Sequence, residues 1–133
     1  MLDVSKFTGD YRESGKWRTA GGTSGDLQGR IIVRVENGQL SFSSDDGHTM
    51  TAQPVDGLSQ PINLEGTGGG ATSSGTLYVG DEAIILEYVA NVRGREEHNV
   101  DVWTFTDGKA TRAGIIRQPE RTIWFEAKMI RTA

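Results

Sequence analysis

The sequence contains no cysteine, and this absence excludes several kinds of chemistry. No disulfide framework, thiol nucleophile or thiolate metal site can form in its 133 residues. A chain without thiols fits a reducing compartment, so a cytoplasmic location is expected. The two histidines, His48 and His98, come from unrelated segments and fall short of a metal-binding constellation. Neither a metal nor a cofactor is therefore predicted.

Long apolar runs and basic clusters are missing as well. No run approaches the ~20 apolar residues that a membrane helix requires, and residues 1–20 lack the basic flank and apolar segment of a signal peptide. The net charge is −4, with 18 acidic and 14 basic residues scattered along the chain, so there is no basic stripe for nucleic acid. The sequence predicts a soluble protein that binds neither membranes nor nucleic acids.

Turn signals between short alternating segments are abundant. The 18 glycines separate runs rich in valine, isoleucine, threonine and aromatic residues, a pattern typical of β-hairpins. Asn37-Gly38 predicts a two-residue turn that sets Val33 opposite Phe42, so that the apolar residues of both arms share a face. No segment has apolar residues at helical spacing, so no long helix is predicted. The sequence allows a short helical turn within residues 2–7.

The later turns extend this pattern to the end of the chain. They are predicted at Gly80-Asp81, pairing Leu77 with Ile84; near Gly94; at Asp107-Gly108, pairing Trp103 with Arg112; and at Pro119-Glu120, pairing Gly114 with Phe125. Residues 65–75 are too rich in glycine for a rigid strand and are interpreted as a flexible loop. The result is a single all-β domain, residues 1–133, with eight to ten antiparallel strands. An up-and-down barrel is predicted because closure removes exposed edges, with a β-sandwich as the alternative.

The N-terminal segment KFTGDYRESGKW carries Phe7, Gly9 and Tyr11 in the pattern Phe-x-Gly-x-Tyr. It resembles the Phe-x-Gly-x-Trp opening of calycins, the superfamily of lipocalins and fatty-acid-binding proteins, with tyrosine in place of tryptophan. The resemblance implies a barrel whose first-strand aromatic residue closes the base and whose interior holds a small ligand. This chain has no counterpart of the lid helices of fatty-acid-binding proteins or of the lipocalin C-terminal helix.

The last predicted strand, RTIWFEAKMIR (121–131), ends its apolar face with an arginine. Fatty-acid-binding proteins are similar in holding a ligand carboxylate with inward arginines on their last strands. The resemblance implies that Arg112 and Arg131 anchor a small, partly apolar, carboxylate-bearing ligand. The tyrosine that follows the last arginine in that family is missing here. The apolar wall of the site would be formed by Trp103, Phe105, Phe125 and Met129.

Other interpretations of the same residues remain open. Arg112 could point outward, Arg131 could cap a fraying terminus, and the aromatic side chains could simply fill the barrel. A buried arginine could also be neutralised by Glu87. An enzyme of the isomerase or cyclase type would use His98 or Glu87 as its base, whereas no histidine–acid spacing supports a triad with the hydroxyls near Ser73. A filled barrel would act through its surface as a homodimer, since both faces of residues 82–93 carry apolar side chains.

Overall fold

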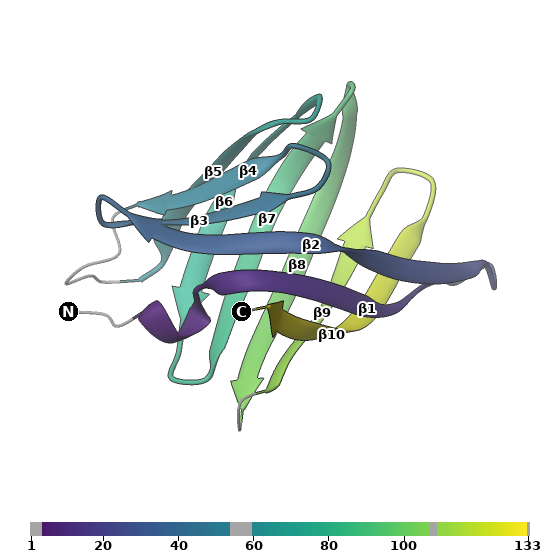
Figure 1. The fold of residues 1–133 in the computed structure, drawn as a ribbon. Coiled ribbons are helices and arrows are strands. Elements are labelled where there is room, and N and C mark those ends of the chain that lie inside the picture. Colours follow the sequence, from purple (N-terminus) through teal and green to yellow (C-terminus); the bar gives the residue numbers. More distant parts are fainter. Residues whose placement is uncertain (1–3, 54–59, 107–108, 133) are drawn as a thin grey trace.

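The strands close into one antiparallel barrel. The computed structural model describes residues 4–53, 60–106 and 109–132. Within them a 3-10 turn, η1 (Ser5–Phe7), precedes ten strands: β1 (Gly9–Thr19), β2 (Ser24–Glu36), β3 (Gln39–Ser44), β4 (Thr49–Gln53), β5 (Ile62–Gly68), β6 (Ala71–Val79), β7 (Ala83–Val92), β8 (Arg95–Thr106), β9 (Lys109–Arg117) and β10 (Thr122–Thr132). Each strand pairs with the next, and β10 returns to β1 (Figure 1). The predicted all-β, up-and-down barrel is confirmed. No helix in the described residues is long and apolar enough to cross a membrane.

The hairpin between β2 and β3 has the predicted register, with Val33 opposite Phe42. Both residues of its turn have positive φ angles, 52° for Asn37 and 73° for Gly38. A type I′ turn requires this conformation at both positions, and asparagine and glycine adopt it more readily than other residues. The local sequence therefore determines the register of this hairpin.

The C-terminal hairpins also agree with the predicted pairings. Gly114 lies opposite Phe125 across β9 and β10. Trp103 lies opposite Arg112 across β8 and β9, although the turn predicted at residues 107–108 is outside the described residues. These pairings put the last three strands in the register that the alternation of apolar residues predicted.

Two predictions about hairpins are wrong. Leu77 pairs with Leu86 and not with Ile84, because the connection between β6 and β7 is two residues longer than a tight turn. The register is thus shifted by two residues. Because side chains alternate between the two faces of a strand, a shift of two leaves the same side chains pointing into the barrel. Residues 65–75 are not a loop: β5 extends to Gly68 and β6 starts at Ala71, and pairing with β4 and β7 holds these glycine-rich strands in place.

The inward side chains at the η1 end of the barrel form an apolar core. The largest of them are fully buried: Phe7, Tyr11, Val33, Leu40, Leu64, Leu77, Ile84, Leu86 and Trp103. Phe7 packs against Phe105 with ring centroids 4.8 Å apart. These side chains form a packed core, and the interpretation of the aromatic residues as core is correct for this part of the interior.

Arg131 closes the η1 end together with Tyr11. The Tyr11 hydroxyl donates a hydrogen bond to the Phe7 carbonyl at 2.8 Å. The Arg131 Nη2 donates to the Tyr11 hydroxyl and to the Lys6 carbonyl, both at 2.7 Å, and its guanidinium lies 5.3 Å from the centre of the Tyr11 ring. Figure 1 shows η1 and the end of β10 close together. The arginine at the end of the apolar face thus ties η1 to β1 and β10, and Tyr11 lies at the base as the Phe-x-Gly-x-Tyr pattern implied.

We expect Tyr11→Phe to lower the free energy of unfolding by about 1–2 kcal/mol, because the Phe7 carbonyl loses its donor and Arg131 loses one acceptor. Urea denaturation measures this change. Tyr78→Phe is the matched control, because Tyr78 is exposed on the outer face, and it should stay within ~0.5 kcal/mol of the parent protein. Equal effects of the two substitutions would contradict the structural role of Tyr11.

Candidate functional site

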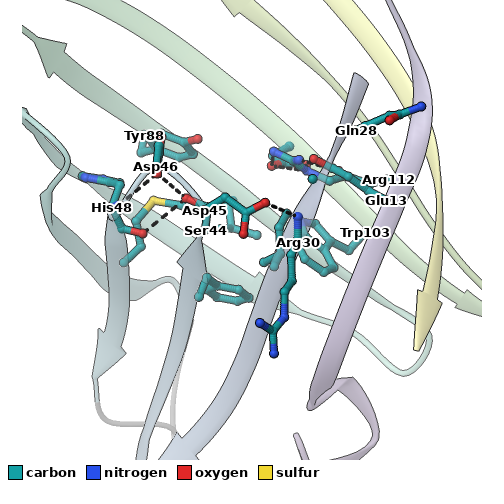
Figure 2. A pocket seen from close by; sticks show the side chains of 16 residues that line it. Glu13, Gln28, Arg30, Ser44, Asp45, Asp46, His48, Tyr88, Trp103 and Arg112 are labelled. Carbon is teal, nitrogen blue, oxygen red and sulfur yellow. Dashed lines mark hydrogen bonds and ion pairs between the residues drawn. The ribbon is translucent and has the colours of Figure 1, made fainter. Parts of the chain in front are cut away.

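Beyond the apolar core the barrel contains a cavity of about 310 Å³ (Figure 2). Its apolar lining comprises Ile31, Phe42, Met50, Leu86 and Trp103, and its polar lining comprises Glu13, Gln28, Arg30, Ser44, Asp45, Asp46, His48, Tyr88, Asp101 and Arg112. The cavity lies where the inward residues change from apolar to charged. Such a lining, apolar with a few convergent polar groups, is typical of small-molecule sites.

Arg112 lies at the centre of the polar lining and is bound by two carboxylates. Its Nε and Nη2 donate to Asp101 at 2.7–2.9 Å, and its Nη1 donates to Glu13 Oε2 at 2.8 Å. The side chains of Arg112, Glu13 and Asp101 are 16%, 7% and 4% exposed. The Arg112 guanidinium also lies 4.8 Å from the centre of the Phe125 ring. Arg112 therefore points into the barrel, in an ion cluster contributed by β1, β8 and β9.

The charges of this cluster do not cancel. Burial alone would lower the pKa of Arg112, but the Asp101 and Glu13 carboxylates outweigh this effect and raise it above its ordinary value. Arg112 therefore stays protonated, and one positive charge faces two negative ones. Its guanidinium is already satisfied by protein, so a ligand carboxylate is not required to stabilise it.

A glycine leaves room between Glu13 and a third carboxylate. A Cβ atom added to Gly29 would lie 3.6 Å from Glu13 Oε1 and 3.7 Å from Asp45 Oδ2. Asp45 is held there by the backbone N–H of Arg30, which donates to its Oδ2 at 2.9 Å. The Arg30 guanidinium itself binds Asp10 (Nε–Oδ1 2.8 Å). The two carboxylate oxygens thus flank an open point on β2.

His48 joins the turn between β3 and β4 to the neighbouring hairpin. Its Nδ1 lies 3.0 Å from the Gly68 carbonyl and must donate to it, which leaves Nε2 to accept a hydrogen bond from the Ser73 hydroxyl at 2.9 Å. This is the geometry of an activated serine. Ser73, however, is only 7% exposed and is not among the residues that line the cavity. The pair therefore serves to fix the hairpins, and sequence spacing did not reveal it because 25 residues separate its members.

The six residues predicted to bind a ligand do not form one site. Arg112 and Trp103 line the cavity, and Phe125 and Arg112 line a second, more apolar hollow of about 300 Å³. Phe105, Met129 and Arg131 line a third hollow, of about 280 Å³, at the η1 end. The predicted strand pairing brings Arg112 and Trp103 together correctly. Arg131 lines neither the cavity nor the second hollow, so it is separated from them.

The acidic partners of Arg112 do not include Glu87, the residue that the sequence suggested. Glu87 and His98 are both exposed on the outer face of β7 and β8, so neither is a partner for Arg112 or a base inside the cavity. Alternation pointed to the actual partners: Glu13 shares a face with the inward Tyr11, and Asp101 shares one with the inward Trp103. In the described residues, no three histidine or acidic side chains are placed to hold a metal ion.

Comparisons with known proteins found no matching family model and no match among curated proteins. The chemistry of the site is therefore interpreted from its own geometry.

Removing Arg112 alone should be strongly destabilising. Arg112→Met leaves two buried carboxylates without their counter-ion, and we expect a loss of about 3–5 kcal/mol of unfolding free energy. The triple variant Glu13→Met, Asp101→Leu and Arg112→Met removes all the charges and should recover about 2 kcal/mol or more of that loss. Urea denaturation of the two proteins checks this. If the triple variant is no more stable than Arg112→Met, unpaired buried charge is not the main cause of the destabilisation.

The turn between β3 and β4 should weaken in acid. Burial would raise the pKa of Asp46, but hydrogen bonds from the Ser44 hydroxyl and the His48 N–H hold it below its ordinary value of 3.8. Its contribution to stability is therefore complete above pH 3.8 and is lost as the pH falls through the lowered pKa. Unfolding measurements between pH 5 and 2.5 should show a steeper loss for the parent than for Asp46→Asn. Ser44→Ala removes the hydroxyl donor to Asp46 and should lose stability less steeply than the parent. Parallel curves for the parent and Asp46→Asn would contradict the prediction.

Proposed function

We propose that the protein binds a small, partly apolar molecule in the barrel cavity. The observation that carries this proposal is the cavity itself: about 310 Å³ lie between apolar and charged groups, beside a packed apolar core. This volume is at the lower end of the roughly 300–1,000 Å³ that ligand sites occupy. The expected ligand is therefore compact, with one polar and one apolar part.

Two donors in the lining support the proposal. Trp103 is 1% exposed, and its Nε1–H is the fully buried side-chain polar atom that has no hydrogen-bond partner in the described residues. An unsatisfied buried donor costs about 1–3 kcal/mol, so a small movement of Trp103 toward a ligand acceptor in the cavity that it lines would be favourable. Burial, reinforced by the Asp101 carboxylate, raises the pKa of Tyr88. Its hydroxyl therefore keeps its proton and can also donate.

The apolar outer face favours a second candidate function, assembly as a homodimer. Ile85, Val89, Val100 and Ile115 are exposed there, and Val100 pairs directly with Ile115. Neighbouring exposed apolar residues are common in interfaces. Binding in the cavity and assembly through this face are compatible, so a dimer would add a function without removing the first.

Filling the cavity should abolish ligand binding. Gly29→Leu projects a side chain toward Glu13 and Asp45. In the matched control, Gly21→Leu, the added Cβ meets only the Thr19 hydroxyl, at 3.9 Å. The parent protein and the control should retain small molecules in native mass spectrometry and shift the Trp103 indole N–H resonance on titration; Gly29→Leu should do neither. Retention of binding by folded Gly29→Leu would overturn the proposal, and a dimer mass without bound molecules would favour the second candidate.

A further inference from the structure

We propose that the cavity selects an organic cation and holds its ammonium or amidinium group between Glu13 and Asp45, beside Gly29. This inference rests on the proposed binding function and names the chemical class of its ligand. It differs from the carboxylate-bearing ligand expected from the sequence. The difference follows from the side chains that surround Arg112.

The balance of charge in the lining is negative. Four carboxylates line the cavity, from Glu13, Asp45, Asp46 and Asp101, together with two arginines. One of these, Arg30, directs its guanidinium to Asp10 outside the cavity, and Arg112 binds Glu13 and Asp101. The four acids thus outnumber the two arginines that line the cavity. A cation is therefore attracted to this cavity, and an anion is repelled by the carboxylates that surround Arg112.

Glu13 has one oxygen that no protein donor satisfies. Its Oε2 accepts from Arg112, but no described residue donates to its Oε1, although the side chain is only 7% exposed. This oxygen therefore keeps its capacity to accept a hydrogen bond from a ligand. Oε1 faces the open point at Gly29, with Asp45 Oδ2 at a similar distance from that point. An ammonium group beside Gly29 would lie near both oxygens, which can accept charge-assisted hydrogen bonds of about 2.7–2.9 Å from it.

The remaining lining suits the body of such a ligand. Phe42, Tyr88 and Trp103 provide aromatic surfaces, and the faces of aromatic rings attract cations. A small movement of Trp103 would let its unpaired N–H bind an acceptor on the ligand. The preferred ligand is thus a small amine or amidine with an apolar body and a hydrogen-bond acceptor.

Three probes of matched size test the charge preference: 2-phenylethylamine, 2-phenylethanol and phenylacetate. Calorimetry, together with the Trp103 indole N–H resonance, measures their affinities at low and high salt. We expect the amine to bind at least tenfold more tightly than the alcohol, the acid to bind most weakly, and the affinity for the amine to fall as salt is added.

Two variants locate the subsite, and a third controls for net charge. Asp45→Asn and Gly29→Ala should lower the affinity for the amine at least fivefold and leave that for the alcohol unchanged. The Gly29→Ala methyl group makes ordinary van der Waals contacts, so this variant should fold normally. Asp26→Asn, which removes an acid paired with Lys16 at the surface, should change neither affinity.

The outcomes separate this inference from the proposed function. If the alcohol or the acid binds in the cavity at least as tightly as the amine, the charge preference is wrong and the binding function stands. If Asp45→Asn and Asp26→Asn lower the affinity for the amine equally, the attraction comes from the net charge of the protein and the proposed subsite is wrong. If no probe produces a saturable shift of the Trp103 resonance, the inference is overturned. If native mass spectrometry also detects no bound molecule, the binding function is overturned too.

Discussion

The ion cluster of Arg112 with Asp101 and Glu13 determines how the interior of the barrel is divided. Its members come from β9, β8 and β1, and 99 residues separate Arg112 from Glu13. Burying three charged side chains is costly, so the strands must present them to one another with good geometry. The described pairing does this by placing Arg112 directly opposite Trp103, two residues from Asp101 on the same face. Apolar side chains pack on one side of the cluster, and the cavity opens beside it.

Stability alone is a weak explanation for such a cluster. A buried ion group is often no more stable than apolar side chains of similar volume, and the core at the η1 end shows that this barrel can be filled by apolar residues. The polar middle of the barrel is therefore consistent with the proposed ligand site.

Turn chemistry and alternation predicted most of the fold because both are local properties. The Asn37-Gly38 turn selects its conformation from two residues, and its register then follows. Local patterns could not reveal the longer connection after Val79 or the strands at residues 65–75, where pairing with neighbours overrides the preference of glycine. The site was less predictable still. Arg112 was recognised by its type and position, whereas its partners depend on how the barrel brings β1 beside β10 and β8 beside β9.

The contrast between the two arginines argues that the charge of the cavity has a function. Arg131 lies at the exposed end of the barrel and binds a carbonyl and a hydroxyl. No carboxylate of the described residues contacts it, and none is needed, since solvent screens its charge. Arg112 is buried and needs a counter-ion, and Asp101 alone would provide one through its bidentate contact. Glu13 therefore exceeds what neutrality requires, and it keeps one oxygen toward the opening at Gly29. A second carboxylate with one oxygen open to the cavity is more than Arg112 requires for neutrality, and it is the feature on which the proposal of a positively charged ligand rests.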